Sequence, residues 1–133
     1  MPTPLAQAGL AALLSAAPAN PLLAPWTGPH GGVPPFDRVE TGQFVPALEA
    51  AMDAQLGAID AITAQAAPPA FENTIAALER SDRLLKQVQA VYGVWSTSMN
   101  TPAFQAIERE MAPRLAAFRD RVAQNEPLFR RIA

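Results

Sequence analysis

The stretch PPAFENTIAALERSDRLL, Pro68–Leu85, decides how the chain folds, because it ends one helical pattern and begins another. Pro68 and Pro69 end the first pattern, since proline has no backbone N–H to donate within a helix. Beyond them, large apolar residues recur at intervals of three and four, the period of a helix with one buried face. We expect one helix from Phe71 to about Met99. Its buried face is predicted to comprise Phe71, Ile75, Leu78, Leu85, Val88, Tyr92, Trp95 and Met99, widened by Leu84 and Val91.

Charged residues on this helix are expected to form pairs along its surface. Asp82 falls on the apolar face, where it either lies at the edge of the bundle or pairs with Lys86 four residues later. Glu79 and Arg83 offer a second pair at the same spacing on the exposed side.

The helix before Pro68 is predicted from the pattern TGQFVPALEAAMDAQLGAIDAITAQ. Thr41 is the expected N-cap, and Pro46 is tolerated because it lies near the first turn. The apolar positions again recur at helical intervals and predict a single buried face. They are Phe44, Leu48, Met52, Leu56, Ile59 and Ile62.

After the helix that ends near Met99, a very short turn leads into a third helix. Thr101 is its expected cap and Pro102 its first residue, and the helix should run to about Gln124, antiparallel to its predecessor. Pro113 lies inside this helix and is expected to kink it near Arg109–Glu110. The predicted buried face is Phe104, Ile107, Met111, Leu115, Phe118 and Val122.

A fourth helix begins in NEPLFRRIA, with Asn125 as cap and Pro127 in the first turn. It has an apolar face of Leu128, Phe129 and Ile132, and the sequence ends at Ala133 after about two turns, as in a piece of a longer protein. The expected fold is all-α. It is an antiparallel helical bundle over residues 43–133, with three long helices and the start of a fourth.

The first 36 residues contain no Asp, Glu, Lys or Arg. Residues 1–19 are expected to be a short apolar helix or a leader, although a secretory signal normally has positive charge before its apolar run. We therefore expect a cytoplasmic protein, or a periplasmic one if residues 1–19 derive from a signal peptide. Residues 20–42 form a Pro/Gly-rich arm, which should be packed on the bundle because it carries four large apolar side chains. These are Leu22, Leu23, Trp26 and Phe36.

Composition excludes several classes of function. The 133 residues, of which 50% are hydrophobic and 17% charged, suit one globular unit. A net charge of -2 argues against a nucleic-acid binder, and no segment is long enough to span a membrane. The chain has no cysteine and only one histidine, His30, in a Pro/Gly-rich loop. Zinc catalysis needs several ligands and nucleophilic catalysis needs a fixed base, so we expect no catalytic, cofactor-binding or metal-binding residue in this chain.

Weaker candidate sites each have a simpler explanation. Glu49 and Asp53 are four residues apart, but without an accompanying Glu-x-x-His motif they indicate a solvated acidic face rather than a metal site. Trp26, Tyr92 and Trp95 could line a ligand pocket, although the helical spacing of the last two favours the core.

The loop and the basic residues near the C-terminus are similarly ambiguous. Gly31–Gly32 beside His30 is too little for a phosphate-binding loop, because a strand and a lysine are missing. Arginines are frequent in the last third but alternate with acidic residues, which favours a mixed helix surface over a phosphate or membrane site. They are Arg109, Arg114, Arg119, Arg121, Arg130 and Arg131.

Three stretches together resemble one family. They are NPLLAPW…VPPFDRVETGQFVPALEAAM, PPAFENTIAALERSDRLLKQV and NTPAFQAIEREMAPRLAAFRDRV…NEPLFRRI, from about Asn20 to Ala133. Their order and spacing resemble the N-terminal region of the M3 zinc metallopeptidases, the thimet oligopeptidase family. Within that family the resemblance is strongest to the bacterial peptidyl-dipeptidase (dipeptidyl carboxypeptidase) branch, with oligopeptidase A as a near relative.

The resemblance implies a mostly helical, two-lobed peptidase whose deep channel admits short, unstructured peptides. It also implies zinc held by an HExxH motif and a later glutamate, beyond Ala133, whereas these 133 residues contain no HExxH. The chain would then help to form a lobe and the channel wall, be inactive alone, and have the missing catalytic domain as its partner. The isolated chain is expected to self-associate through uncovered faces. The alternative is a free-standing helical interaction module without catalytic activity.

Overall fold

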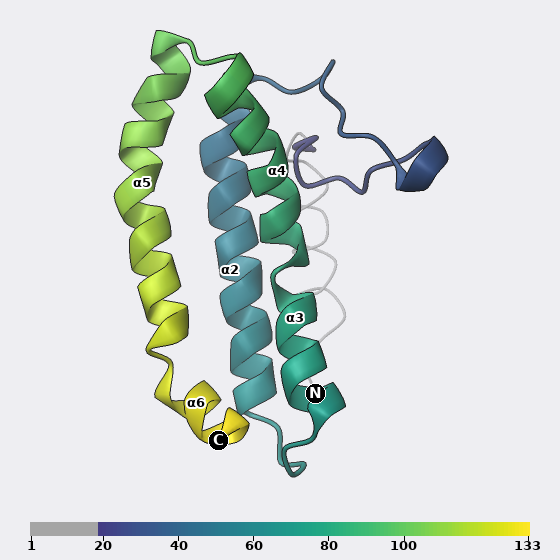
Figure 1. Ribbon diagram of the computed structural model, residues 1–133, viewed down its shortest axis with the longest axis vertical. Coiled ribbons are helices and arrows are strands. Elements are labelled where there is room, and N and C mark those ends of the chain that lie inside the picture. Colours follow the sequence, from purple (N-terminus) through teal and green to yellow (C-terminus); the bar gives the residue numbers. More distant parts are fainter. Residues whose placement is uncertain (1–18) are drawn as a thin grey trace, which may run out of the picture.

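The computed structural model describes residues 19–133, and this part of the chain is all-α, as predicted. The helix or leader expected within residues 1–19 lies, apart from its last residue, outside the described residues. In Figure 1, α2 lies between α5 on one side and α3 and α4 on the other, while α6 folds beneath its lower end. The helices are α2 (Phe44–Thr63), α3 (Ala77–Ser81), α4 (Arg83–Ser98), α5 (Pro102–Ala123) and α6 (Glu126–Ile132).

The start of α2 differs from the prediction. Thr41 does not cap α2 but begins a 3-10 turn, Thr41–Gln43, that leads into it. Gln43 stabilises this entry, because its Oε1 accepts the backbone N–H of Glu40 at 2.8 Å. The predicted apolar face is buried apart from Leu56, which is half-buried. Ala47, Ala51 and Gln55 complete the buried side of the helix.

The predicted continuous helix from Phe71 to Met99 is wrong in its first third. It begins as a π-helical segment, Phe71–Ala76, continues as α3, and is interrupted at Asp82 before α4 begins. At the entry, Asn73 Oδ1 accepts the backbone N–H of Ala70 at 2.8 Å, and Asn73 Nδ2 donates to the Pro68 carbonyl at 2.9 Å. These bonds tie the first turn to the preceding loop and compete with a regular α-helical turn.

The interruptions move two predicted core residues to the surface. Phe71 is 66% exposed, because the π-helical turn and the break at Asp82 change the register that a continuous helix would have kept. Met99 is half exposed, since α4 ends at Ser98 and the backbone of Met99 is not helical. Between these ends the predicted face is buried at Leu85, Val88, Val91 and Trp95. It is half-buried at Ile75, Leu78, Leu84 and Tyr92.

One of the two predicted ion pairs forms. Lys86 Nζ lies 2.8 Å from Asp82 Oδ2. No pair between Glu79 and Arg83 occurs in the described part of the chain, because the break at Asp82 separates the two residues and removes their helical spacing. Arg80 instead pairs with Glu72, eight residues earlier, at 3.8 Å.

The caps of α5 and α6 are confirmed. Thr101 Oγ1 accepts the N–H of Phe104 at 3.3 Å, and Asn125 Oδ1 accepts that of Leu128 at 2.9 Å. The α5 helix continues through Pro113 to Ala123 without interruption. Its predicted face is buried at Phe104, Met111, Leu115 and Phe118, and half-buried at Ile107 and Val122.

The apolar face predicted for the fourth helix is only partly buried. Leu128 packs with Ile59 and Ile62 under the lower end of α2. Phe129 is 68% exposed and Ile132 is also exposed, so two of the three apolar residues of α6 do not join the core.

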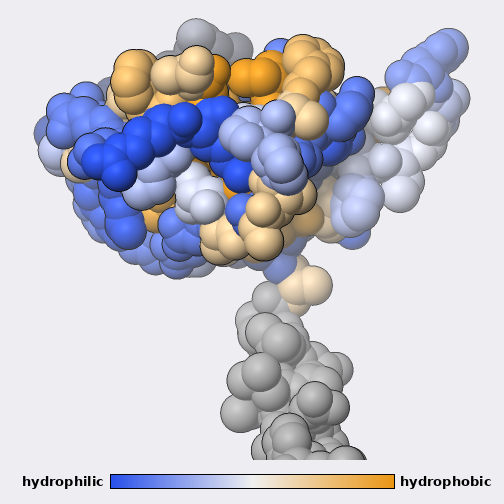
Figure 2. All heavy atoms as spheres, turned by 90° about the horizontal axis from the view of Figure 1, so that it is seen from below, coloured by the Kyte–Doolittle hydropathy of each residue, from blue (hydrophilic) through white to orange (hydrophobic). Residues whose placement is uncertain are grey.

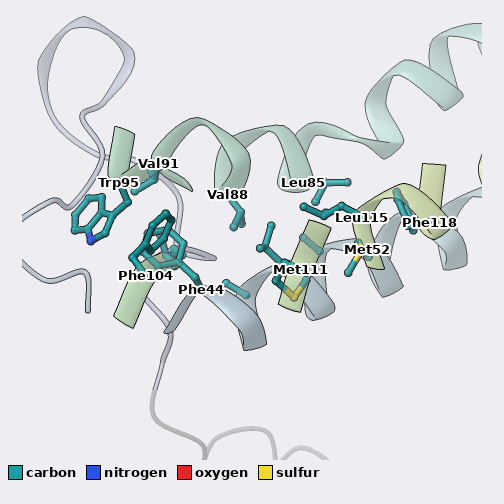
Figure 3. Close-up of a cluster of buried hydrophobic side chains, with 14 residues drawn as sticks. Phe44, Met52, Leu85, Val88, Val91, Trp95, Phe104, Met111, Leu115 and Phe118 are labelled. Carbon is teal, nitrogen blue, oxygen red and sulfur yellow. The ribbon is translucent and has the colours of Figure 1, made fainter. Parts of the chain in front are cut away.

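The core is centred on Phe44, at the start of α2, which has no exposed surface. Its ring lies 5.2 Å from that of Phe104, 5.4 Å from Trp95 and 5.8 Å from Tyr92. Figure 3 shows Phe44, Phe104 and Trp95 at one end of a line of apolar side chains that continues through Val88 and Met111 to Phe118. The three long helices are therefore joined along one continuous core.

The Pro/Gly-rich arm lies against α4 and the start of α2. Gln87 Nε2 donates to the carbonyls of Leu22 and Ala24 at 3.0 and 2.9 Å, and the Leu22 side chain is buried. Farther along, the Phe36 ring stacks on Trp95 with 6.1 Å between centroids. The arm is thus held by both hydrogen bonds and apolar packing.

Candidate functional site

A groove opens where α4 and α5 diverge above α2. It has a volume of about 270 Å³, and its walls are mainly apolar. In Figure 3, Leu85 of α4 and Leu115 of α5 lie close together, with Phe118 farther along α5. The lining residues, called the α4–α5 groove below, are Gln55, Asp82, Leu85, Lys86, Gln89, Leu115, Phe118, Arg119, Val122 and Ala123.

Two buried acceptors in the α4–α5 groove have no hydrogen-bond partner among the described residues. One is Oε1 of Gln55, whose residue is only 7% exposed, and the other is Oδ1 of Asp82. Most buried polar atoms in folded proteins are hydrogen-bonded, so these two enclosed oxygens are exceptions that lower stability.

The charges of the α4–α5 groove leave it slightly positive. Asp82 is already paired with Lys86 through its other oxygen, Oδ2. Arg119, at the same groove, donates its Nε to the Leu115 carbonyl at 3.3 Å and has no carboxylate partner within the described part of the chain. One carboxylate and two cations therefore face the groove.

Gln55 was not predicted from the sequence, although its position carries a signal. Position 55 lies three residues after Met52 and four before Ile59, which places it on the buried stripe of α2. The predicted buried face of this helix includes the neighbouring apolar residue Leu56 instead of Gln55. Asp82 is likewise a polar residue on an otherwise apolar face. The structure brings Gln55 and Asp82 to the same groove.

Gln55 leads to a stability prediction, because an unpartnered buried acceptor is unfavourable. Gln55→Met keeps the length of the side chain and removes the acceptor, and it should raise the free energy of unfolding by about 1 kcal/mol. Urea denaturation followed by circular dichroism measures the change. Gln124→Met, on an exposed glutamine just after α5, is the control and should change stability by less than about 0.5 kcal/mol. A clear loss of stability in Gln55→Met would contradict the assignment.

Glu49 and Asp53 do not form a joint site. Glu49 is bound by the guanidinium group of Arg114, which also contacts Glu110 at 3.2 Å, and Asp53 is exposed. The hydrogen bond to Glu49 is the main reason why the pKa of Arg114 is raised above its ordinary value. Among residues 19–133, no group of three or more His, Cys, Asp or Glu side chains is placed to hold a metal.

The aromatic candidates belong to the core rather than to a ligand pocket. Tyr92 and Trp95 pack on Phe44, and burial raises the pKa of the Tyr92 hydroxyl, with a smaller contribution from Glu108. Trp26 packs against the core from the arm. His30 lies in an exposed loop with a positive φ of 62°.

The arginines do not form one basic patch. Arg114 and Arg130 pair with carboxylates, while Arg119 and Arg131 donate to backbone carbonyls. Arg109 and Arg121 are exposed. Within the described residues, none of the helices is long and apolar enough to cross a membrane.

Arg131 takes part in a second polar cluster at the lower end of the bundle, which the sequence analysis did not foresee. Its Nε donates to Thr74 Oγ1 at 3.1 Å, and its Nη2 donates to the Ala67 carbonyl at 3.0 Å. Thr74 in turn donates to Asn73 Oδ1 at 2.8 Å. The cluster joins α6 to the FENT segment, and the same end of the bundle carries the exposed rings of Phe71 and Phe129. Figure 2, the view from below, shows hydrophobic and hydrophilic residues side by side.

Comparison with known proteins identifies relatives of the chain. No protein-family profile matches it. It is 31% identical to dipeptidyl carboxypeptidase of Salmonella typhimurium over 113 residues, which is 85% of this chain and 16% of that enzyme. The Escherichia coli dipeptidyl carboxypeptidase is 30% identical over the same shares of the two chains. Oligopeptidase A of Escherichia coli is 26% identical over 111 residues, 84% of this chain and 16% of that protein.

These relatives agree with the resemblance carried by the three sequence stretches. They are peptidases of the M3 family, and the chain spans about 16% of the length of those it matches. The chain is therefore related to the M3 peptidases over a stretch that corresponds to about 16% of their length, and residues 19–133 of it are all-α.

Proposed function

We propose that this chain is the N-terminal, non-catalytic helical region of an M3-type zinc metallopeptidase of the peptidyl-dipeptidase kind. The observation that carries the proposal is the 31% identity with dipeptidyl carboxypeptidase over 113 residues, in a chain that spans only 16% of that enzyme. The complete protein would hydrolyse short peptides. Zinc would be held by residues outside these 133, because the chain has no HExxH and only one histidine.

The role of the helices would be structural. The α2, α4 and α5 helices share a continuous core, which makes a rigid block suited to a lobe and to the wall of a substrate channel. Exposed Phe71 and Phe129 at the lower end, and the α4–α5 groove on the side, are apolar surfaces that further parts of the polypeptide would cover. In the isolated chain, the same surfaces favour self-association.

Activity and metal content of the purified chain test this proposal. We expect no dipeptide release from a blocked tetrapeptide and no stoichiometric zinc by elemental analysis after incubation with zinc. Dipeptidyl carboxypeptidase of Escherichia coli, assayed in parallel, is the positive control. Dipeptide release with stoichiometric zinc from these 133 residues alone would overturn the proposal.

The gene provides an independent test of the parent protein. An open reading frame that continues past codon 133 and encodes HExxH is the expected result. A stop codon directly after Ala133 would instead favour the free-standing interaction module and contradict a peptidase parent.

A further inference from the structure

We propose that the bundle is hinged at the level of the α4–α5 groove, so that its lower part opens as one unit while the upper part stays folded. The lower unit comprises residues 59–81 and 125–133, which include the end of α2, the FENT segment, α3 and α6. The upper unit comprises residues 20–55 and 83–122. This inference rests on the packing of the described residues and does not depend on the relationship to peptidases.

The buried apolar side chains form two separate cores, one in each unit. The upper core joins α2, α4 and α5, and it extends down α2 to Met52 and down α5 to Phe118. In the lower core, Ile59 and Ile62 of α2 pack on Leu128 of α6. Because the two cores are separate, the contacts of the lower core can be lost while those of the upper core are kept.

The boundary between the two cores coincides with a break in the backbone. Asp82 separates α3 from α4 and has a φ of -95° and a ψ of 1°, outside the helical region. Figure 1 shows α3 and α4 as two coils with an interruption between them. Leu78 before the break packs against the lower core, whereas Leu85 after it belongs to the upper core. Residues at the ends of helices are where hinges commonly lie, so Asp82 is placed to serve as one.

The same level of the bundle is loosely packed. The α4–α5 groove, of about 270 Å³, opens here, and its lining includes Val122, which packs against both cores. Gln55 Oε1 and Asp82 Oδ1 are both enclosed at this level and have no partner among the described residues. Water would reach these two oxygens once the units separate, so their burial favours the opened form.

The lower unit is held together by its own hydrogen bonds. Arg131 of α6 donates to Thr74 Oγ1 at 3.1 Å and to the Ala67 carbonyl at 3.0 Å. Gln65 Nε2, in the loop after α2, donates to the Asn73 carbonyl of the FENT segment at 3.0 Å. These bonds join three stretches of the lower unit, so the stretches are expected to open together rather than one by one.

Polar contacts across the boundary are few. Within residues 19–133, the Lys86–Asp82 pair at the break itself is the one side-chain ion pair or hydrogen bond that connects the boundary to either unit from the other side. The Lys86 side chain is 70% exposed, and an exposed pair of this kind contributes little to stability. The units are therefore joined mainly by the continuous helices α2 and α5.

Native-state hydrogen exchange of the 15N-labelled chain in low urea tests the hinge, at a pH at which exchange reports the opening equilibrium. We expect the amides of α3, α6 and the last turn of α2 to converge on one common opening equilibrium. They should exchange at least about 100-fold faster than the amides in the middle of α4 and α5. A single equilibrium shared by both units would overturn the proposal, and so would lower amides that open independently of one another.

Two mild core substitutions separate opening of the lower unit from unfolding of the whole chain. Val88, in the upper core, and Ile59, in the lower core, both have no exposed surface. Val88→Ala should speed exchange of the upper amides about tenfold and that of the lower amides less than twofold, because the upper core stays folded when the lower unit opens. Ile59→Val should speed exchange of the lower amides about fivefold. Equal acceleration of both sets by Val88→Ala would mean that the bundle opens only as a whole.

The position of the boundary is tested by Gln55→Met, with Gln124→Met as the control at an exposed glutamine. Gln55→Met should slow exchange of the lower amides about fivefold, because its acceptor is enclosed only while the two units are together. Gln124→Met should leave the exchange rates unchanged. If Gln55→Met slows only the upper amides, Gln55 belongs to the interior of the upper unit, and the boundary proposed here is wrong.

Discussion

Phe44→Ala is expected to lower the free energy of unfolding by about 4 kcal/mol. Phe44 has no exposed surface, and its ring packs against Tyr92, Trp95 and Phe104, which come from two further helices. Truncation removes a large buried apolar group and leaves a cavity that these rings cannot all move to fill. Since small domains are typically stable by only about 5–15 kcal/mol, the variant should be close to unfolding.

Urea denaturation of the chain and of this variant measures the effect, and the same substitution at Phe71 is the matched control. Phe71 is 66% exposed, so Phe71→Ala should change the free energy of unfolding by less than about 0.5 kcal/mol. The pair also tests the break at Asp82, because a continuous helix would have placed Phe71 in the core. Similar losses at both positions would contradict this arrangement of the core.

The helices α2 and α5 could be predicted from the sequence because they are regular. In each, apolar residues recur at helical spacing, and α5 also has its cap, Thr101, directly before it. The prediction failed where the backbone departs from the α-helix. The period alone could not show that Phe71 begins a π-helical turn or that Asp82 interrupts the helix.

The α4–α5 groove could not be predicted, because it depends on how far two helices diverge. Asp82 is 27 positions from Gln55 in sequence, and only the packing of α4 on α2 brings both to one groove. The local signal was available, since each is a polar residue on an apolar stripe. Such residues are therefore the positions at which a helical pattern departs from a uniform apolar core.

The second prediction with a large expected change in stability concerns the lower end of the bundle. Arg131→Leu should lower the free energy of unfolding by about 2 kcal/mol, because it removes charge-assisted hydrogen bonds. The lost bonds are those to Thr74 Oγ1 at 3.1 Å and to the Ala67 carbonyl at 3.0 Å, together with a longer one to the Gln65 carbonyl at 3.5 Å. Thr74 is buried, so its hydroxyl loses a donor that water cannot easily replace. Urea denaturation gives the size of the loss, and hydrogen exchange of the α6 amides shows whether that helix opens first.

Arg130→Leu is the matched control, because Arg130 is the adjacent arginine on α6 and pairs only with Glu126 in an exposed position. An exposed ion pair of this kind contributes less than about 0.5 kcal/mol. Arg131→Lys should not restore stability, since an ammonium group cannot reproduce the planar set of donors that reaches Thr74 and Ala67 together. Equal effects of Arg130→Leu and Arg131→Leu would mean that charge alone matters at this end. A larger loss for Arg131→Leu, which Arg131→Lys does not restore, would mean that the guanidinium group holds α6 in place.

Helix α6 has only seven residues, which is too few for a helix to be stable by itself. Its position therefore depends on Leu128 and on the contact of Arg131 with the FENT segment.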